Sequence, residues 1–342
     1  MADVNVYVFE GANNSFPNYS TLAGAIADNQ QDLTATEGIL YITITGSWSS
    51  PEVVNPLSIT GFTTSTDYYV SIKTEGAARH SGQWSDSAYT LAVTAAPSYY
   101  GAIQIVSVQN LRIDGLQILN TVDSAPTNTV CGITIHDTGQ DIDELHVSNC
   151  FLKATGTVES AEAHQGIGRL VRINDGGSFY IYNNVVSGFS VGIQRAYSAN
   201  LCTGVFYNNT VLNSTYQGIH MRASADGQLY LKNNIVQNSV TDYYLTYADT
   251  DSETNISSDT TSPNSALRQK NVTFVDSSNW DYRPATSDLA AKGNGTDLST
   301  DADGKLSFAV DAAGNARTIP WDIGALNFGS SSKLKVFGAL IY

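Results

Sequence analysis

Hydrophobic and polar residues alternate in short segments through the middle of the chain, with a period of two residues rather than the 3.6 of a helix. Residues 179–181, 204–206 and 229–231 show this pattern, and polar residues that suit a turn follow each segment. The β-branched and aromatic residues in these segments favour strands over helices. The pattern therefore predicts an all-β protein built from short strands.

A longer repeat is superimposed on this alternation. Tyr-Asn-Asn-Val-Val at 182–186 returns 25 residues later as Tyr-Asn-Asn-Thr-Val at 207–211, and again as Lys-Asn-Asn-Ile-Val at 232–236. A Gly-Ile step follows in phase at 192–193 and 218–219. A repeat of this length that contains several short strands is typical of one coil of a solenoid. We therefore predict a parallel β-helix with about 25 residues per coil.

The asparagine pairs of the repeat are predicted to form corners of the coils. Asn readily adopts the left-handed backbone conformation of a tight turn, and stacked amides can hydrogen-bond from one coil to the next. A groove lined with Asn side chains that binds a ligand is the alternative interpretation. The expected ladder consists of Asn183, Asn184, Asn208, Asn209, Asn233 and Asn234. Inward ladders are expected for Ile181, Phe206 and Leu231, and for Ile193 and Ile219.

The two ends of the chain suggest how the solenoid is closed. Residues 20–29 form an amphipathic pattern with Ser or Thr at the N-cap position, which predicts a short helix over the first coil. We expect four regions: an N-terminal strand and capping helix (1–46), the β-helix (47–275), a C-terminal closing cassette (276–329) and a tail (330–342).

Composition narrows the possible partners. Only 14% of residues are charged, and 17 Lys and Arg stand against 32 Asp and Glu, which argues against binding to nucleic acid. No apolar run approaches the ~18 residues of a membrane span. The three cysteines form no metal-binding pattern and are expected to be buried, unpaired side chains. The first basic residue is Lys73, so we expect no signal peptide and synthesis in the cytoplasm, unless a leader was removed.

The repeat between residues 105 and 245 resembles the right-handed parallel β-helix proteins of the pectate-lyase-like superfamily. The motifs at 280–284 (Trp-Asp-Tyr-Arg-Pro), 314–317 (Gly-Asn-Ala-Arg) and 321–325 (Trp-Asp-Ile-Gly-Ala) are similar to the terminal cassette of bacterial and phage β-helix proteins. The resemblance implies a right-handed solenoid. It does not imply one activity, because this scaffold carries polysaccharide lyases, hydrolases, adhesins and virion spikes.

Candidate catalytic residues come from aligning the coils on their Gly-Ile steps. The alignment places three basic residues in one outward column and two beside it: His136, Arg172 and Arg222, with Arg195 and His220. The resemblance implies that a lyase would use such a base, often with Ca²⁺ held by carboxylates. Surface ion pairs with neighbouring Asp residues explain the column equally well.

One weak metal site is also predicted. Asp297, Asp301 and Asp303 precede Gly304 in a pattern that could wrap a calcium ion, although the closing Glu of an EF-hand is missing. A solvated turn is the favoured interpretation, and no cofactor is otherwise expected.

The tail has apolar residues at even spacing, which suits a strand that adds to a partner or seals the last coil: Leu334, Val336, Leu340 and Tyr342.

The leading hypothesis is a non-enzymatic structural virion protein of a bacteriophage, of the head-decoration or spike type, on the virion surface. It would face a polysaccharide and assemble with other virion proteins and with itself, a trimer being favoured. The alternatives are a lyase or hydrolase of an acidic polysaccharide that uses the His/Arg column, and a carbohydrate-binding adhesin, secreted if a leader was removed.

Overall fold

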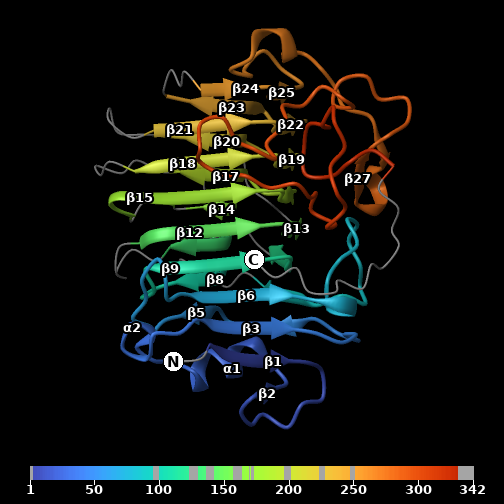
Figure 1. Cartoon of the computed structure of the whole chain (residues 1–342). Coiled ribbons are helices and arrows are strands. Elements are labelled where there is room, and N and C mark those ends of the chain that lie inside the picture. Colours follow the sequence, from blue (N-terminus) through green and yellow to red (C-terminus); the bar gives the residue numbers. More distant parts are fainter. Residues whose placement is uncertain are drawn as a thin grey trace.

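The structure, a computed structural model, describes residues 3–94, 100–122, 130–135, 142–156, 164–168, 170, 173–195, 202–222, 228–246 and 251–329. Its strands form three long parallel sheets of ten, eight and seven strands, stacked coil upon coil along one axis (Figure 1). The chain is therefore an all-β parallel β-helix, as the repeat predicts.

Each complete coil contributes one strand to each sheet. The ten-stranded sheet contains β1 (Val4–Val8), β2 (Asn18–Tyr19), β3 (Leu40–Ile44), β6 (Val70–Thr74), β9 (Asn110–Asp114), β12 (Ile142–Ser148), β15 (Ile173–Tyr182), β18 (Thr203–Tyr207), β21 (Gln228–Lys232) and β24 (Asp251–Glu253). The eight-stranded sheet contains β4 (Glu52–Val53), β7 (Thr90–Thr94), β10 (Gln117–Val122), β13 (Phe151–Gly156), β16 (Val185–Ser187), β19 (Thr210–Leu212), β22 (Ile235–Gln237) and β25 (Ile256–Ser257). The seven-stranded sheet contains β5 (Leu57–Ile59), β8 (Tyr100–Ile105), β11 (Val130–Ile135), β14 (His164–Gly168), β17 (Val191–Arg195), β20 (Gln217–Met221) and β23 (Thr241–Leu245).

The remaining elements lie outside these sheets. They are the helices α1 (Leu22–Asp28) and α2 (Leu33–Thr36), the hairpin β26 (Phe274–Asp276) and β27 (Asp281–Pro284), and the 3₁₀ turns η1 (Gly76–Ala78), η2 (Ser265–Leu267) and η3 (Ser277–Asn279). No helix in the described ranges has the length and apolar character needed to cross a lipid bilayer.

Inward side chains stack in ladders that form one continuous core. Ile181 lies opposite Phe206, and Phe206 lies opposite Leu231, in consecutive strands of the ten-stranded sheet. Ile193 lies opposite Ile219 in the seven-stranded sheet. All five side chains are fully buried, which is the register that the repeat predicts.

The asparagine pairs stand at corners where the chain leaves the ten-stranded sheet. The first asparagine of each pair has a left-handed backbone, with φ of 56°, 52° and 57° at Asn183, Asn208 and Asn233. The second asparagines begin a ladder in which each amide donates to the next, over 2.8–3.1 Å, and in which all members but the last are fully buried: Asn184, Asn209, Asn234, Asn255 and Asn264. The last two members lie beyond the repeat that the sequence shows.

The short helix α1 lies over the N-terminal end of the core and buries Leu22, Ala25 and Ile26. Thr21 caps it by accepting from the backbone N–H of Gly24. The carboxylate of Glu52 accepts from the first backbone N–H groups of the helix, 2.8 and 3.1 Å away. Since β1 and β3 already pair in the ten-stranded sheet, the solenoid begins within the first 46 residues.

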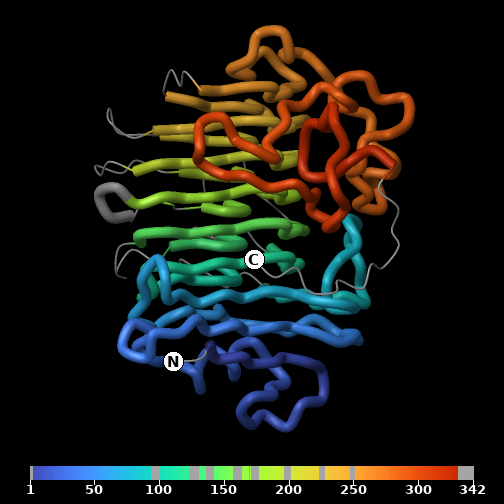
Figure 2. Tube along the Cα trace, viewed as in Figure 1, coloured from blue at the N-terminus to red at the C-terminus, as the bar shows by residue number. Residues whose placement is uncertain are grey.

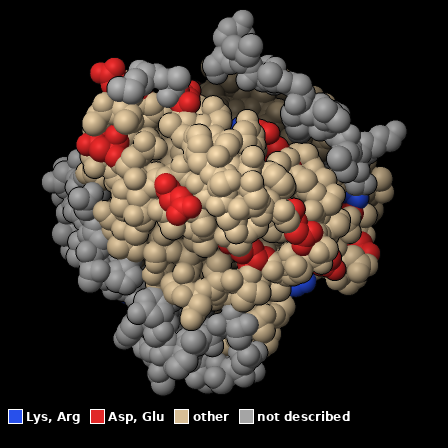
Figure 3. Space-filling view, turned by 90° about the horizontal axis from the view of Figure 1, so that it is seen from below, with Lys and Arg blue, Asp and Glu red and all other residues tan. Residues whose placement is uncertain are grey.

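The C-terminal cassette, which we call the closing segment (276–329), folds back along the flank of the solenoid (Figure 2). Corner asparagines hold it there: Nδ2 of Asn208 donates to the carbonyl of Gly324 over 3.0 Å, and Nδ2 of Asn233 to that of Thr296 over 2.8 Å. The closing segment therefore covers part of the outer surface of the coils. The face at the N-terminal end of the solenoid is mostly uncharged, with scattered acidic groups (Figure 3).

Candidate functional site

A row of partly exposed aromatic and charged side chains crosses the outer face of the ten-stranded sheet. We call it the surface strip: Tyr41, Tyr69, Arg112, Glu144, His146 and Tyr180. The β-sheet register produces the row, because Arg112, His146 and Tyr180 lie opposite one another in β9, β12 and β15. Each follows an inward apolar residue, so each faces outward.

Arg112 occupies the centre of the strip. Its guanidinium carbon lies 3.8 Å from the centre of the Tyr69 ring, and Nη1 donates to the Tyr69 hydroxyl over 2.9 Å. On its other side, Nη2 lies 3.5 Å from Oε1 of Glu144. The side chain of Arg112 is 40% exposed, so its positive charge is accessible from the solvent.

The other half of the strip consists of the carboxylate of Glu144, the imidazole of His146 and the phenol of Tyr180. Nε2 of His146 lies 2.8 Å from Oε1 of Glu144, and the hydrogen bond from His146 lowers the pKa of Glu144 despite partial burial. The rings of His146 and Tyr180 are stacked, 4.4 Å apart at 18°. Glu144 is therefore ionised near neutral pH, and the two rings each cover one face of the other.

At the other end of the strip, burial and the neighbouring Tyr69 raise the pKa of Tyr41, so that this phenol stays neutral. The strip offers aromatic side chains that stack on one another or on Arg112, hydroxyl groups, one accessible cation and one carboxylate. Such a set can pack against a sugar and hydrogen-bond its hydroxyl groups.

The column predicted from the Gly-Ile alignment is not a single outward surface. Arg195 faces inward: it lies opposite the core residue Met221, is fully buried, and Nη2 lies 2.6 Å from Sγ of Cys202. Ile193 points inward, so Arg195, two residues later, does too. This corrects the placement of Arg195 beside an outward column.

The rest of that column is also divided. His220 is fully buried, near Gln194 and edge-on to the ring of Tyr244. Arg222, just after β20, is exposed. His136 and Arg172 lie outside the described residues.

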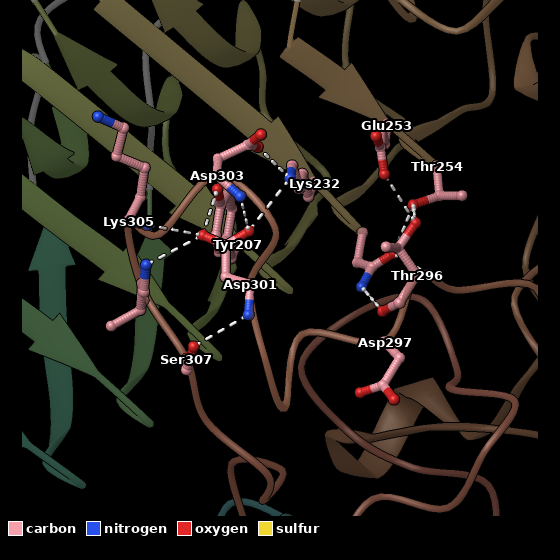
Figure 4. Close-up of polar contacts among 12 residues, drawn as sticks. Tyr207, Lys232, Glu253, Thr254, Thr296, Asp297, Asp301, Asp303, Lys305 and Ser307 are labelled. Atoms are coloured by element: carbon pink, nitrogen blue, oxygen red, sulfur yellow. Dashed lines mark hydrogen bonds and ion pairs between the residues drawn. The ribbon is translucent and has the colours of Figure 1, made fainter.

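The three candidate calcium ligands, Asp297, Asp301 and Asp303, do not surround a space that could hold a metal ion. Lys232 lies between two of them: Nζ is 3.2 Å from Oδ1 of Asp301 and also contacts Oδ2 of Asp303 (Figure 4). Asp297 points away from this pair and accepts from the backbone N–H of Ser299. Within the described ranges, no three His, Cys, Asp or Glu side chains are placed to hold a metal ion.

The sequence favoured a solvated turn around these aspartates. Asp301 does not fit this prediction, because its side chain is completely buried. Sequence reasoning treated this loop alone, whereas the closing segment brings it onto the solenoid. The apolar tail residues Leu334, Val336, Leu340 and Tyr342 lie outside the described residues.

Sequence reasoning missed the surface strip, although a signal for it exists. Arg112, His146 and Tyr180 are spaced by 34 residues (146 − 112 and 180 − 146), and each follows an apolar residue that starts an alternating segment. Aligning these earlier, longer coils would have placed the three side chains in one outward column.

No protein-family model matches this chain, and no curated protein matches its sequence. The surface strip is therefore the feature from which a function is inferred.

Proposed function

We propose that this chain is a non-enzymatic structural solenoid that presents the surface strip to a polysaccharide, as a virion surface subunit of a bacteriophage would. The observation that carries the proposal is the stacked, outward row from Tyr69 through Arg112 to Tyr180. The phage setting rests on the likeness of the closing segment to phage β-helix proteins, and it includes self-assembly of the chain and contact with other virion proteins.

The chemistry of the strip suits binding better than hydrolysis. Glycosidases generally use two carboxyl groups, one of which is protonated. The strip contains a single carboxylate, Glu144, and its lowered pKa keeps it ionised. Arg112 can pair with a uronate carboxylate, which favours an acidic polysaccharide as the ligand.

Binding of an acidic oligosaccharide panel, measured by calorimetry, tests the proposal. Arg112→Gln is expected to weaken binding about tenfold or more, because a charge-assisted hydrogen bond contributes about 1.5–3 kcal/mol. Tyr244→Ala is the matched control, since Tyr244 is 40% exposed but lies on the seven-stranded sheet. Absence of binding to every member of the panel, or equal loss in both variants, would contradict the proposal.

The same samples distinguish the lyase alternative. A lyase creates a double bond in the uronate product, and its absorbance can be followed with time. Steady absorbance with saturable binding is expected. Turnover that disappears in His146→Gln would replace the binding function with an enzymatic one at the same strip.

A further inference from the structure

Lys232, at the end of β21, contacts Asp301 of the closing segment. Among the described residues, it is the only buried lysine at the end of a solenoid strand that contacts this segment. We propose that the two side chains condense into an amide, an intramolecular isopeptide bond, with Asp303 as the proton carrier. Lys232 ends β21, and Asp301 and Asp303 lie in the closing segment, so the bond would join the two covalently (Figure 4).

The reacting groups are held together and shielded from water. Only 3% of the Lys232 side chain and none of the Asp301 side chain is exposed, whereas Asp303 is 32% exposed. The surrounding cluster is apolar and aromatic: Val205, Tyr207, Tyr230, Leu298 and Trp321. Burial of this kind favours neutral over charged forms and keeps water from competing with the amine.

The carboxyl group of Asp301 is oriented for attack. Its Oδ2 accepts from the backbone N–H groups of Lys305 and Leu306, each 3.0 Å away, and from the Tyr207 hydroxyl at 3.3 Å. Three donors on one oxygen are the arrangement that stabilises a developing oxyanion. The other oxygen, Oδ1, faces Nζ of Lys232.

The cluster is ionic at rest. Burial opposes the charge of Lys232, but the hydrogen bond to Asp303 and the charge of Asp301 outweigh it and raise the pKa of the amine. Burial opposes the charge of Asp301 too, but the backbone N–H groups of Leu306 and Lys305 lower its pKa. Reaction therefore begins with transfer of one proton from Nζ to Oδ1, which makes it slow.

The remaining steps balance without a co-reactant. The neutral Nζ attacks Cγ of Asp301, forming the C–N bond and placing negative charge on Oδ2. The nitrogen then gives a proton to Asp303, which passes it to the Oδ1 hydroxyl. Cleavage of the Cγ–Oδ1 bond releases one water molecule, Oδ2 becomes the amide oxygen, and Asp303 is again a carboxylate.

Intact-mass spectrometry of the purified full-length chain, after prolonged incubation at neutral pH, tests the proposal. The folded protein is expected to be lighter than its sequence by one water, and digestion should yield one branched peptide that joins Lys232 to Asp301. Lys232→Arg keeps the charge but cannot form the bond, so this variant should show the full sequence mass. The matched control is Lys73→Arg, which changes a half-buried lysine paired with Glu75 and should still lose water.

Two further variants separate this reaction from other losses of water. Succinimide formation at Asp303-Gly304 would also release water, but it would persist in Lys232→Arg and would give no branched peptide. Asp301→Asn should lose ammonia instead of water, because the leaving group changes. Asp303→Asn should slow formation about 100-fold or more, as loss of a proton carrier does. A wild-type chain that retains its full sequence mass, or a loss that maps elsewhere, would overturn the proposal.

Discussion

Nη2 of Arg317 donates to Oδ1 of Asn183 over 2.8 Å, although 134 residues separate the two in the chain. Arg317 also donates to the carbonyl oxygens of Gly324 and Ala325. Burial lowers the pKa of Arg317 to about 10, and the charges of Asp311 and Asp322 partly offset this effect. One guanidinium therefore ties the closing segment both to itself and to a corner of the solenoid.

Removing Arg317 should loosen the closing segment. Arg317→Met is expected to destabilise the protein by about 3–5 kcal/mol, because several buried carbonyl groups lose their donor. A double-mutant cycle with Asn183→Ala, followed by chemical denaturation, should show a coupling of about 1.5–3 kcal/mol. Additive effects of the two substitutions would show that the contact contributes nothing to stability.

The buried asparagine ladder should be more sensitive than an exposed asparagine. Asn209 accepts from the backbone N–H of Asn184 and donates to the carbonyl of Ile181. Asn209→Ala leaves both buried groups without this partner, which should cost about 2–5 kcal/mol in denaturation experiments. The control Asn13→Ala, on the exposed N-terminal loop, should change stability by about 0.5 kcal/mol or less. Similar losses in both variants would contradict the ladder.

The glycine of the Gly-Ile step should not tolerate a methyl group. A Cβ on Gly192 would lie 2.2 Å from Cγ1 of Val211 and 2.8 Å from the carbonyl oxygen of Gly218. Gly192→Ala should therefore destabilise the protein by about 1–3 kcal/mol or more. In the Val211→Ala background, where the first clash is absent, the same substitution should cost less. An equal cost in both backgrounds would assign the effect to the backbone contact alone.

Stability should fall in mild acid through His80. Burial, and then the charge of Arg79, lower the pKa of His80 to about 3 from the ordinary value of 6.5. Nε2 of the neutral ring lies 2.6 Å from the carbonyl of Asn149, and Nδ1 accepts from Gly82. Between pH 6.5 and pH 3, His80 is protonated in the unfolded chain but neutral in the folded protein. The contribution of His80 to the free energy of unfolding is therefore complete above pH 6.5 and decreases as the pH falls toward 3.

Chemical denaturation between pH 7 and pH 5 measures this effect in a range where most carboxylates do not yet titrate. Below the pKa of His80 in the unfolded chain, the free energy of unfolding should fall by up to about 1.4 kcal/mol per pH unit. His80→Gln, which cannot take up the proton, should flatten the profile. Parallel profiles for the two proteins would exclude His80 as the source.

The arrangement of the coils could be predicted from the sequence because identical positions stack. Asn183, Asn208 and Asn233 need the same left-handed turn, and Ile181, Phe206 and Leu231 fill the same layer of the core. A repeated local requirement sets the register of every coil, so a 25-residue spacing is sufficient to identify a parallel β-helix. Coils with longer insertions hid the spacing of Arg112, His146 and Tyr180, and the surface strip was missed.

The coil, its corners and its core could therefore be predicted from the sequence alone, because every coil repeats the same local requirement at the same spacing. The folded arrangement sets which surfaces stay open, because the closing segment folds back over part of the sheet faces. It buried Asp301 against Lys232 rather than leaving a solvated turn. Arg195 points inward for a local reason, because it lies two residues after the inward Ile193 on the same strand and side chains along a strand alternate.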